Sequence, residues 1–231
     1  MRSSRKLLQI TCSCLVLAFC PEIFSEQVNP DPNRFKKAFN EFNQADKSSP
    51  HASKELVLFT GSSSIRFWNL QKFFPKLNAI NRGFGGAHLS DVLHFYDQLF
   101  PKYRPSMIVL YCGENDLWSG KTVPQVKKDF LELWSRIDTD LPDVKLIYLS
   151  CKPSPKRISK WELYQDLNQR IKKFSEAEKN LTFIDISSTL LQSGLNFYDG
   201  FWRTDNLHLN DRGYEQWTKR LKPYLRATKN P

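Results

Sequence analysis

The sequence predicts a three-layer α/β sandwich, in which a parallel sheet of about five strands is covered by helices on both faces. Three observations support this prediction. From residue 55 onward, short apolar segments alternate with longer amphipathic segments, as in strands joined by helical crossovers. The short segments are apolar on both faces, as expected for a sheet buried on both sides. Of the 231 residues, 40% are hydrophobic and 25% are charged, which is the composition of an ordinary globular domain.

The N-terminal segment, residues 1–25, is predicted to be a secretory signal peptide. Three basic residues among the first six precede an uncharged and mostly apolar run over residues 7–19. This run is too short for a membrane span, which needs about 20 residues, but it fits the apolar region of a signal peptide. We therefore expect an exported protein, periplasmic or secreted, with cleavage after Ser25. The alternative is a lipoprotein anchored at Cys20, although Phe19 is bulky where such sites carry a small residue.

The next segment, residues 26–54, is polar and is predicted to be an extension with one peripheral helix near residues 34–44. Its apolar residues recur at helical spacing, so the helix is expected to pack on the domain that follows. We place that domain at residues 55–226 and a short C-terminal tail at residues 227–231. No internal repeat is visible.

The strands and helices of the domain follow from the length and periodicity of its apolar segments. The predicted strands cover residues 56–60, 78–81, 107–112, 144–150 and 181–186. Helices are predicted near residues 90–100, 123–138 and 161–178, and a last helix over residues 211–225. Asn210 or Asp211 can cap the exposed amides of that last helix.

Only two of the five cysteines, Cys112 and Cys151, lie in the predicted domain. Both follow or end predicted buried strands, where free thiols are common. We therefore expect free thiols. A disulfide is the alternative, because an exported protein permits one.

The chain carries 34 Lys and Arg against 24 Asp and Glu, for a formal net charge of +10. Such an excess can indicate binding to nucleic acid or to an anionic membrane. The basic residues form no long run, and the densest group lies within residues 152–160. No nucleic-acid-binding motif accompanies it. We interpret this group as solvent-exposed and expect no nucleic-acid partner, with peripheral membrane association as the alternative.

Four polar or glycine-rich segments stand at the ends of predicted elements. Residues 61–64, 81–86 and 113–116 follow the first three strands, and residues 205–208 precede the last helix. In open α/β sheets, ligands bind beyond the carboxyl ends of the strands. We therefore expect these four segments to lie together at one edge of the sheet.

These segments contain the groups that nucleophilic catalysis by a serine requires. A serine hydroxyl is a weak nucleophile until a base takes its proton, and His208 is the candidate base. Asp205, three residues earlier, can accept a hydrogen bond from the imidazole and stabilise the imidazolium. The backbone amide of Gly86 and the side-chain amide of Asn115 can donate to the oxyanion of a tetrahedral intermediate. A serine at the start of a helix also lies at the positive end of the helix dipole.

Taken singly, each segment is typical of an ordinary loop, turn or helix cap. Asp205 and His208 could also be half of a metal site. A metal site needs further His or Cys ligands, and the chain has four histidines in all. We therefore expect no metal.

Taken together, the order and placement of these segments over residues 55–226 resemble the SGNH or GDSL hydrolase superfamily. The resemblance implies a flavodoxin-like fold and the hydrolysis of carboxylic esters through an acyl-enzyme, without a cofactor. It implies the catalytic residues Ser63, Asp205 and His208. It also implies an oxyanion hole made of the backbone amide of Ser63, Gly86 and Asn115.

The first segment departs from the family pattern at one position. The family commonly has Gly-Asp-Ser-Leu, whereas Ser62 stands at the Asp position here. The nucleophile is assigned to Ser63, because it lies two residues after Gly61, as the family serine does. Ser62 and Ser64 remain the alternatives.

The substrate is less constrained by the sequence than the reaction. Aromatic side chains flank the segments, and Trp118, Phe201 and Trp202 are our candidates for contact with a sugar ring or an acyl chain; core packing is the alternative. We expect short acyl groups, such as acetyl, on carbohydrate. A lysophospholipid substrate is the second hypothesis. A catalytically inactive polysaccharide-binding relative is the third, and only Ser62 favours it.

Overall fold

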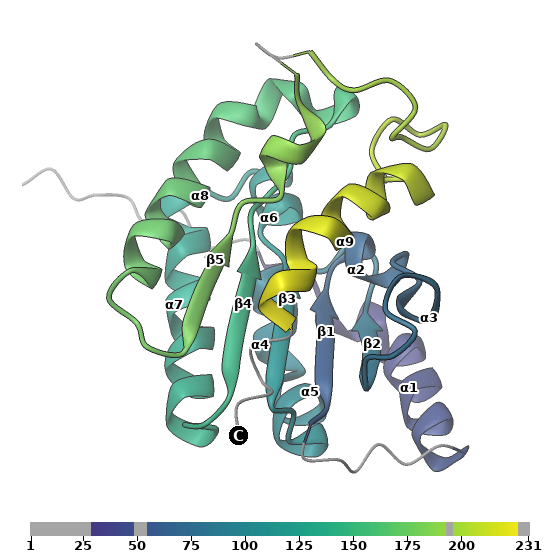
Figure 1. The fold of residues 1–231 in the computed structure, drawn as a ribbon. Helices are drawn as coiled ribbons and strands as arrows, with labels where there is room; N and C mark the ends of the chain where they lie inside the picture. The colour runs from purple at the N-terminus through teal and green to yellow at the C-terminus, as the bar shows by residue number, and fades with distance from the viewer. Residues whose placement is uncertain (1–28, 49–54, 193–195, 226–231) are drawn as a thin grey trace, which may run out of the picture.

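The computed structural model describes residues 29–48, 55–192 and 196–225 (Figure 1). The predicted signal peptide with its cleavage site, Cys20 and the C-terminal tail lie outside the described residues. Within these residues, no helix combines the length and the hydropathy needed to cross a membrane.

A five-stranded parallel sheet forms the centre of the molecule (Figure 1). Its strands are β1 (Val57–Gly61), β2 (Ala79–Gly83), β3 (Met107–Tyr111), β4 (Lys145–Leu149) and β5 (Leu181–Ile184), in the order β2-β1-β3-β4-β5. All four pairings are parallel. The order reverses at β1, which pairs with β2 on one side and β3 on the other. Ligand sites in open α/β sheets lie at such a reversal, beyond the carboxyl ends of the strands.

Helices cover both faces of the sheet. They are α1 (Lys36–Ser48), α2 (Ser63–Arg66), α3 (Leu70–Phe73), α4 (Leu89–His94), α5 (Tyr96–Tyr103), α6 (Glu114–Trp118), α7 (Val123–Asp140), α8 (Trp161–Ser175) and α9 (Asp211–Leu225). Three 3₁₀ helices join them: η1 (Pro32–Phe35), η2 (Pro155–Lys160) and η3 (Ser187–Leu190). In Figure 1, α9 crosses in front of the sheet, and α4, α5 and α7 lie behind it.

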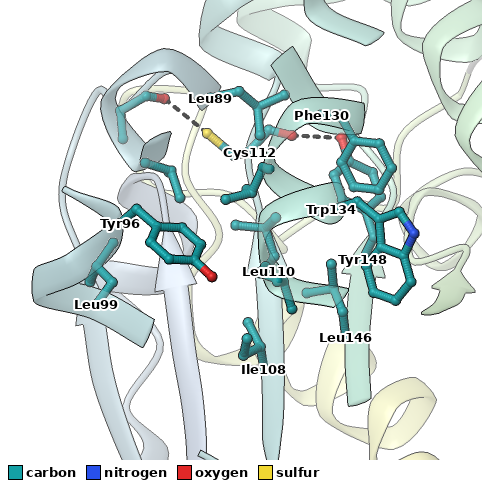
Figure 2. Close-up of a cluster of buried hydrophobic side chains, with 14 of the residues drawn as sticks. Leu89, Tyr96, Leu99, Ile108, Leu110, Cys112, Phe130, Trp134, Leu146 and Tyr148 are labelled. Carbon is teal, nitrogen blue, oxygen red and sulfur yellow. Dashed lines mark hydrogen bonds between the residues drawn. The ribbon is translucent and has the colours of Figure 1, made fainter. Parts of the chain in front are cut away.

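The two faces of the sheet bury alternate residues of each strand, because successive side chains of a strand point to opposite sides. In β3, Ile108 and Leu110 pack into the core formed with α1, α4, α5, α7 and α8. Met107 and Val109 pack into the second core, with α2, α3 and α9. Figure 2 shows part of the first core, where side chains of α4, α5 and α7 surround those of β3 and β4.

The predicted three-layer fold is therefore confirmed. Each strand boundary lies within two residues of its prediction, and the last helix coincides with α9. Asn210 is the cap of α9, because its Oδ1 accepts hydrogen bonds from the backbone N–H of Arg212 at 3.0 Å and of Gly213 at 3.3 Å.

Two local features differ from the prediction. The helix expected near residues 90–100 is two helices, α4 and α5, separated at Phe95. The Phe95 ring stacks on Phe39 of α1, with ring centroids 3.8 Å apart. The short helices α2, α3 and α6 were not predicted, because four or five residues are too few to show helical periodicity.

Helix α1 is joined to the domain by both packing and charge. Phe39 is 4% exposed, and Asp46 accepts hydrogen bonds from Arg82 of β2 and Lys102 of α5. Arg34, just before α1, pairs with Asp91 of α4. The N-terminal helix is thus part of the helical layer on one face of the sheet.

Cys112 and Cys151 are buried free thiols. The Tyr148 hydroxyl donates to the carbonyl oxygen of Cys112 at 2.6 Å (Figure 2). Burial raises the pKa of both thiols, so both remain protonated and unreactive at neutral pH.

Candidate active site

Ser63 lies at a sharp turn between β1 and α2. Gly61 ends β1 with φ +115°, and a Cβ at this position would lie 2.1 Å from the carbonyl oxygen of Tyr111 in β3. Only glycine fits so close to the neighbouring strand. The backbone N–H of Ser62 donates to the same carbonyl at 2.9 Å, and α2 begins at Ser63. The amide of a first helical residue has no partner within its helix, so that of Ser63 can donate to a substrate.

The side chains of Ser63, His208 and Asp205 form one hydrogen-bonded relay. The Nε2 atom of His208 lies 2.8 Å from Oγ of Ser63, and its Nδ1 atom lies 2.6 Å from Oδ2 of Asp205. Ser63 and His208 are 145 residues apart in the sequence. Of the three consecutive serines, Ser62 and Ser64 are buried, and Ser63 is the one that contacts the imidazole.

The surroundings of Asp205 determine which nitrogen of His208 carries the proton. Burial alone would raise the pKa of Asp205. The hydrogen bonds from the His208 ring and from the backbone amides of His208 and Leu207 outweigh burial and hold this pKa below 3.8. An ionised carboxylate can only accept, so Nδ1 donates to Asp205. In the neutral imidazole, Nε2 is then free of hydrogen and can accept the hydroxyl hydrogen of Ser63, as a general base must.

Gly86 lies in the turn between β2 and α4. Its φ is +85°, which favours glycine, and a Cβ there would have no neighbour within 4 Å, so this side of the residue faces open space. The next carbonyl along the chain, that of Ala87, accepts a hydrogen bond from Nδ2 of Asn115 at 3.0 Å. The turn with Gly86 and the helix with Asn115 are therefore in direct contact.

Asn115 lies in the first turn of α6 and is 9% exposed. Its Oδ1 accepts a hydrogen bond from Nη1 of Arg157 at 3.0 Å. Because an amide nitrogen carries two hydrogens, the bond from Nδ2 to Ala87 leaves one hydrogen for another acceptor. The amides of Ser63, Gly86 and Asn115 therefore stay the candidate oxyanion donors that the resemblance implied.

A buried charge cluster lies behind Asn115. Glu114 accepts hydrogen bonds from Lys152 at 3.1 Å and from Arg157 at 3.0 Å, as well as from the hydroxyl of Tyr111. Burial alone would raise the pKa of Glu114, but the charges of Lys152 and Arg157 overcome it and lower this pKa. Two cations therefore face one carboxylate next to the candidate oxyanion hole.

This cluster corrects one expectation from the sequence. Residues 152–160 were interpreted as a solvent-exposed basic group, but the side chains of Lys152 and Arg157 are only 1% and 12% exposed. The counter-charge that allows their burial is Glu114, 38 residues before Lys152. An acidic residue directly after a buried strand was the available signal, since a buried carboxylate needs a cationic partner.

The three aromatic candidates differ in their surroundings. Trp118 is 41% exposed, at the C-terminal end of α6, and the Arg157 guanidinium lies 5.0 Å from its ring centroid. Phe201 and Trp202 are partly buried and pack against the core under α9, which agrees with the core-packing alternative for both. Phe67, another aromatic residue that flanks the segments, has its ring edge-on to that of His208, with centroids 4.9 Å apart.

A second buried network joins the turn before α4 to α6. Asp116 accepts a hydrogen bond from the backbone N–H of Leu89 at 3.0 Å. The Nζ atom of Lys121 lies 3.4 Å from Asp116 and 2.8 Å from Asp129. The Nε2 atom of His88 lies 3.3 Å from the hydroxyl oxygen of Ser119, within hydrogen-bond distance. These bonds hold together the two segments that carry Gly86 and Asn115.

Within the described residues, no group of three or more His, Cys, Asp or Glu side chains could hold a metal ion. The described site brings together a hydroxyl, an imidazole and a carboxylate, with the amides of Ser63, Gly86 and Asn115 as candidate oxyanion donors. This set can carry out acyl transfer through a covalent intermediate.

The model of the GDSL-like lipase/acylhydrolase family matches residues 63–216 of this chain. The matched segment contains the relay and the three candidate oxyanion donors. No curated protein shows significant sequence similarity to the chain.

Solved structures share the fold. A GDSL-like lipase from Bacteroides thetaiotaomicron has a TM-score of 0.71 at 17% identity, and the match covers 82% of this chain and 98% of that one. A family 3 carbohydrate esterase from Clostridium thermocellum has a TM-score of 0.62 at 19% identity, with 77% and 100% covered. A variant of an acetyl-xylooligosaccharide esterase from Geobacillus has a TM-score of 0.61 at 16% identity, with 76% and 95% covered.

Proposed function

This chain belongs to the GDSL-like lipase/acylhydrolase family and is a carboxylic ester hydrolase, and from that premise we propose that Ser63, His208 and Asp205 cleave short-chain esters of carbohydrate through an acyl-enzyme. The observation that carries the proposal is the relay, with 2.8 Å between His208 and Ser63 and 2.6 Å between His208 and Asp205. Both distances suit proton transfer and the orientation of the base.

In the acylation step, Oγ of Ser63 attacks the ester carbonyl carbon while Nε2 of His208 takes the hydroxyl proton. The carbonyl oxygen becomes an oxyanion, which accepts hydrogen bonds from the amides of Ser63, Gly86 and Asn115. His208 then gives its proton to the leaving alcohol, and the acyl group remains on Ser63. In deacylation, a water molecule gives a proton to His208 and attacks the acyl carbon, which releases the carboxylic acid and restores Ser63.

Two observations support a short acyl group on a sugar. Two proteins that share the fold are carbohydrate esterases, one of them acting on acetylated xylooligosaccharides. Trp118, three residues after Asn115, has a partly exposed ring, and exposed aromatic faces stack on sugar rings.

The second candidate is a lysophospholipid. The same exposed ring of Trp118 can pack along an acyl chain, and the net charge of +10 favours an anionic surface. Two assays of the purified protein separate the two candidates. One measures hydrolysis of a series of esters that differ only in acyl length, and the other compares an acetylated xylooligosaccharide with lysophospholipid dispersions. Preference for acetyl over chains of eight or more carbons favours the carbohydrate ester, and the reverse preference favours the lipid.

The test of the mechanism is removal of the relay. Ser63→Ala and His208→Ala are each expected to lower kcat on p-nitrophenyl acetate by on the order of 10⁴. Asn115→Ala is expected to cost about 10²–10³, the usual effect of losing one oxyanion donor. Wild-type labelling of Ser63 by a fluorophosphonate counts against an inactive polysaccharide-binding relative. Rates in Ser63→Ala equal to the wild-type rate would refute the mechanism.

We further propose that the protein is exported and that residues 1–25 are its signal peptide. The support is the basic start and the uncharged apolar run over residues 7–19. The lipoprotein alternative at Cys20 is retained, and the two differ in the mass of the processed protein.

A further inference from the structure

We propose that the ester substrate carries a negatively charged group, a carboxylate or a phosphate, which binds between Arg66 and Arg203 beside the relay. This inference rests on the proposed esterase function and specifies the substrate class of the same site. The observation behind it is a pair of guanidinium groups that share one aromatic ring next to the candidate base.

The shared ring is that of Phe67. The guanidinium carbon of Arg66 lies 4.6 Å from its centroid, and that of Arg203 lies 4.3 Å from it. The same ring contacts the imidazole of His208 edge-on. Phe67 follows α2, and Arg203 belongs to the loop that carries Asp205 and His208. The two charges therefore come from both sequence segments that form the relay.

Arg66 also borders the turn of the oxyanion hole. A Cβ added to Gly85 would lie 3.2 Å from the guanidinium carbon of Arg66, so this charge lies directly against the residue before Gly86. The Arg66 guanidinium thus lies against the residue before a candidate oxyanion donor, and the Arg203 guanidinium packs on the ring that contacts the imidazole. A group held by both arginines would lie beside the Phe67 ring.

In the described residues, no carboxylate lies within 4.0 Å of Arg66 or Arg203, whereas Lys152 and Arg157 are paired with Glu114. Both Arg66 and Arg203 are exposed. The Nε atom of Arg203 donates to the carbonyl oxygen of Leu209 at 3.1 Å, which orients this guanidinium and leaves its two terminal nitrogens to donate elsewhere.

Two like charges held against one ring repel each other. A bound anion would remove that repulsion. Carboxylate and phosphate are the anions whose geometry matches the planar fork of a guanidinium. The arrangement therefore favours an acidic sugar ester, with an anionic lipid headgroup as the other source of the same chemistry.

The experiment compares pairs of esters that differ only in charge. The first pair is O-acetylated methyl glucuronide and methyl glucoside acetylated at the same hydroxyl. The second pair is lysophosphatidylglycerol and a monoacylglycerol with the same acyl chain. We expect kcat/KM to be about tenfold higher for the charged member of one pair, and the pair that responds identifies the source. This preference should shrink as salt is raised, because the arginines are exposed.

Variants then connect the preference to the two arginines. Arg66→Gln, Arg203→Gln and the double variant should bring the ratio of charged to neutral ester towards one, while Arg66→Lys and Arg203→Lys should retain much of it. Arg170→Gln is the matched control, because Arg170 is an exposed arginine of α8 paired with Asp166; it should leave the ratio at the wild-type value. Circular dichroism and the midpoint of thermal unfolding report whether each variant is folded.

The possible results separate the two proposals. If the wild-type protein cleaves neutral esters but shows no preference for the charged member of either pair, the anion inference fails and the esterase function stands. A preference that survives in the double Gln variant also overturns the inference. If the wild-type protein cleaves no ester at all, the proposed function itself fails.

Discussion

At the scale of single residues, the orientation of the Asn115 amide is determined by what its two neighbours can do. Arg157 can only donate, so the atom of Asn115 that faces it, 3.0 Å away, is the oxygen. The carbonyl of Ala87 can only accept, so the atom facing it is the nitrogen. Both neighbours require the same orientation of the amide. Arg157 thus acts as a positioning residue for the candidate oxyanion donor.

We expect Arg157→Ala to lower kcat about 10- to 100-fold with little change in KM, because the amide of Asn115 loses its fixed orientation. In an Asn115→Ala background, the same change should cost much less, since the amide it orients is gone. Steady-state kinetics of the two single variants and the double variant measure this coupling. Arg170→Ala serves as the control on α8. Fully additive losses would show that Arg157 does not act through Asn115.

At the scale of elements, the contact between the turn before α4 and helix α6 contains two buried groups with opposed titrations. Burial lowers the pKa of His88 from 6.5 to about 4. Burial also raises the pKa of Asp116 from 3.8 to about 6, against the charge of Lys121. His88 is therefore neutral at pH 7, so its approach to Asp116, 3.9 Å from Nδ1 to Oδ1, is not an ion pair at that pH.

These shifts predict opposite pH dependences of stability for two variants. Between pH 4 and 6.5 the unfolded chain holds a proton on His88 more tightly than the folded protein does. The contribution of His88 to the free energy of unfolding therefore increases as pH rises. Between about pH 4 and 6 the folded protein holds a proton on Asp116 more tightly than the unfolded chain does. The contribution of Asp116 to the free energy of unfolding therefore decreases as pH rises. His88→Gln should therefore destabilise less at pH 4 than at pH 7, and Asp116→Asn should destabilise more at pH 4. Urea unfolding of the wild type and both variants at the two pH values tests this. The prediction is contradicted if the loss of unfolding free energy changes between pH 4 and pH 7 in the same direction for both variants.

The attachment of α1 gives a second prediction at this scale. Phe39 is 4% exposed and stacks on Phe95, so Phe39→Ala should lower the free energy of unfolding by about 3 kcal/mol through lost burial and a cavity. Lys37→Ala, on the exposed side of the same helix, should change it by less than about 0.5 kcal/mol. Denaturant unfolding measures both. A small effect of Phe39→Ala would mean that α1 detaches before the domain unfolds.

At the scale of the whole molecule, the order of the strands is what creates the site. Strand β1 lies between β2 and β3, because the chain places β2 on one side of β1 and then crosses over to place β3 on the other side. The segments after these three strands then surround one point. The loop before α9 adds the imidazole and the carboxylate, with Asn210 as the cap that ends this loop.

The export proposal is tested on the whole chain. After expression in a secretory bacterial host, intact mass should show a protein that begins at residue 26, if cleavage follows Ser25. The lipoprotein alternative predicts a protein that begins at Cys20 with the added mass of its acyl chains, and it should partition into detergent. Recovery of the full 231-residue chain from the cytoplasm would overturn both.

The sequence by itself predicted the layers and the five strands, and it narrowed the relay to Asp205, His208 and one of three consecutive serines. Apolar periodicity reports which side chains are buried, and the order of polar segments at strand ends restricts where a site can form. Only the tertiary structure decided that Ser63, and not Ser62 or Ser64, contacts His208, because that depends on the turn that Gly61 permits against β3. It alone placed Arg157 behind Asn115 and set Arg66 and Arg203 around Phe67. The physical reason is that local pattern encodes burial, whereas pairing between distant side chains depends on how the packed elements lie in space.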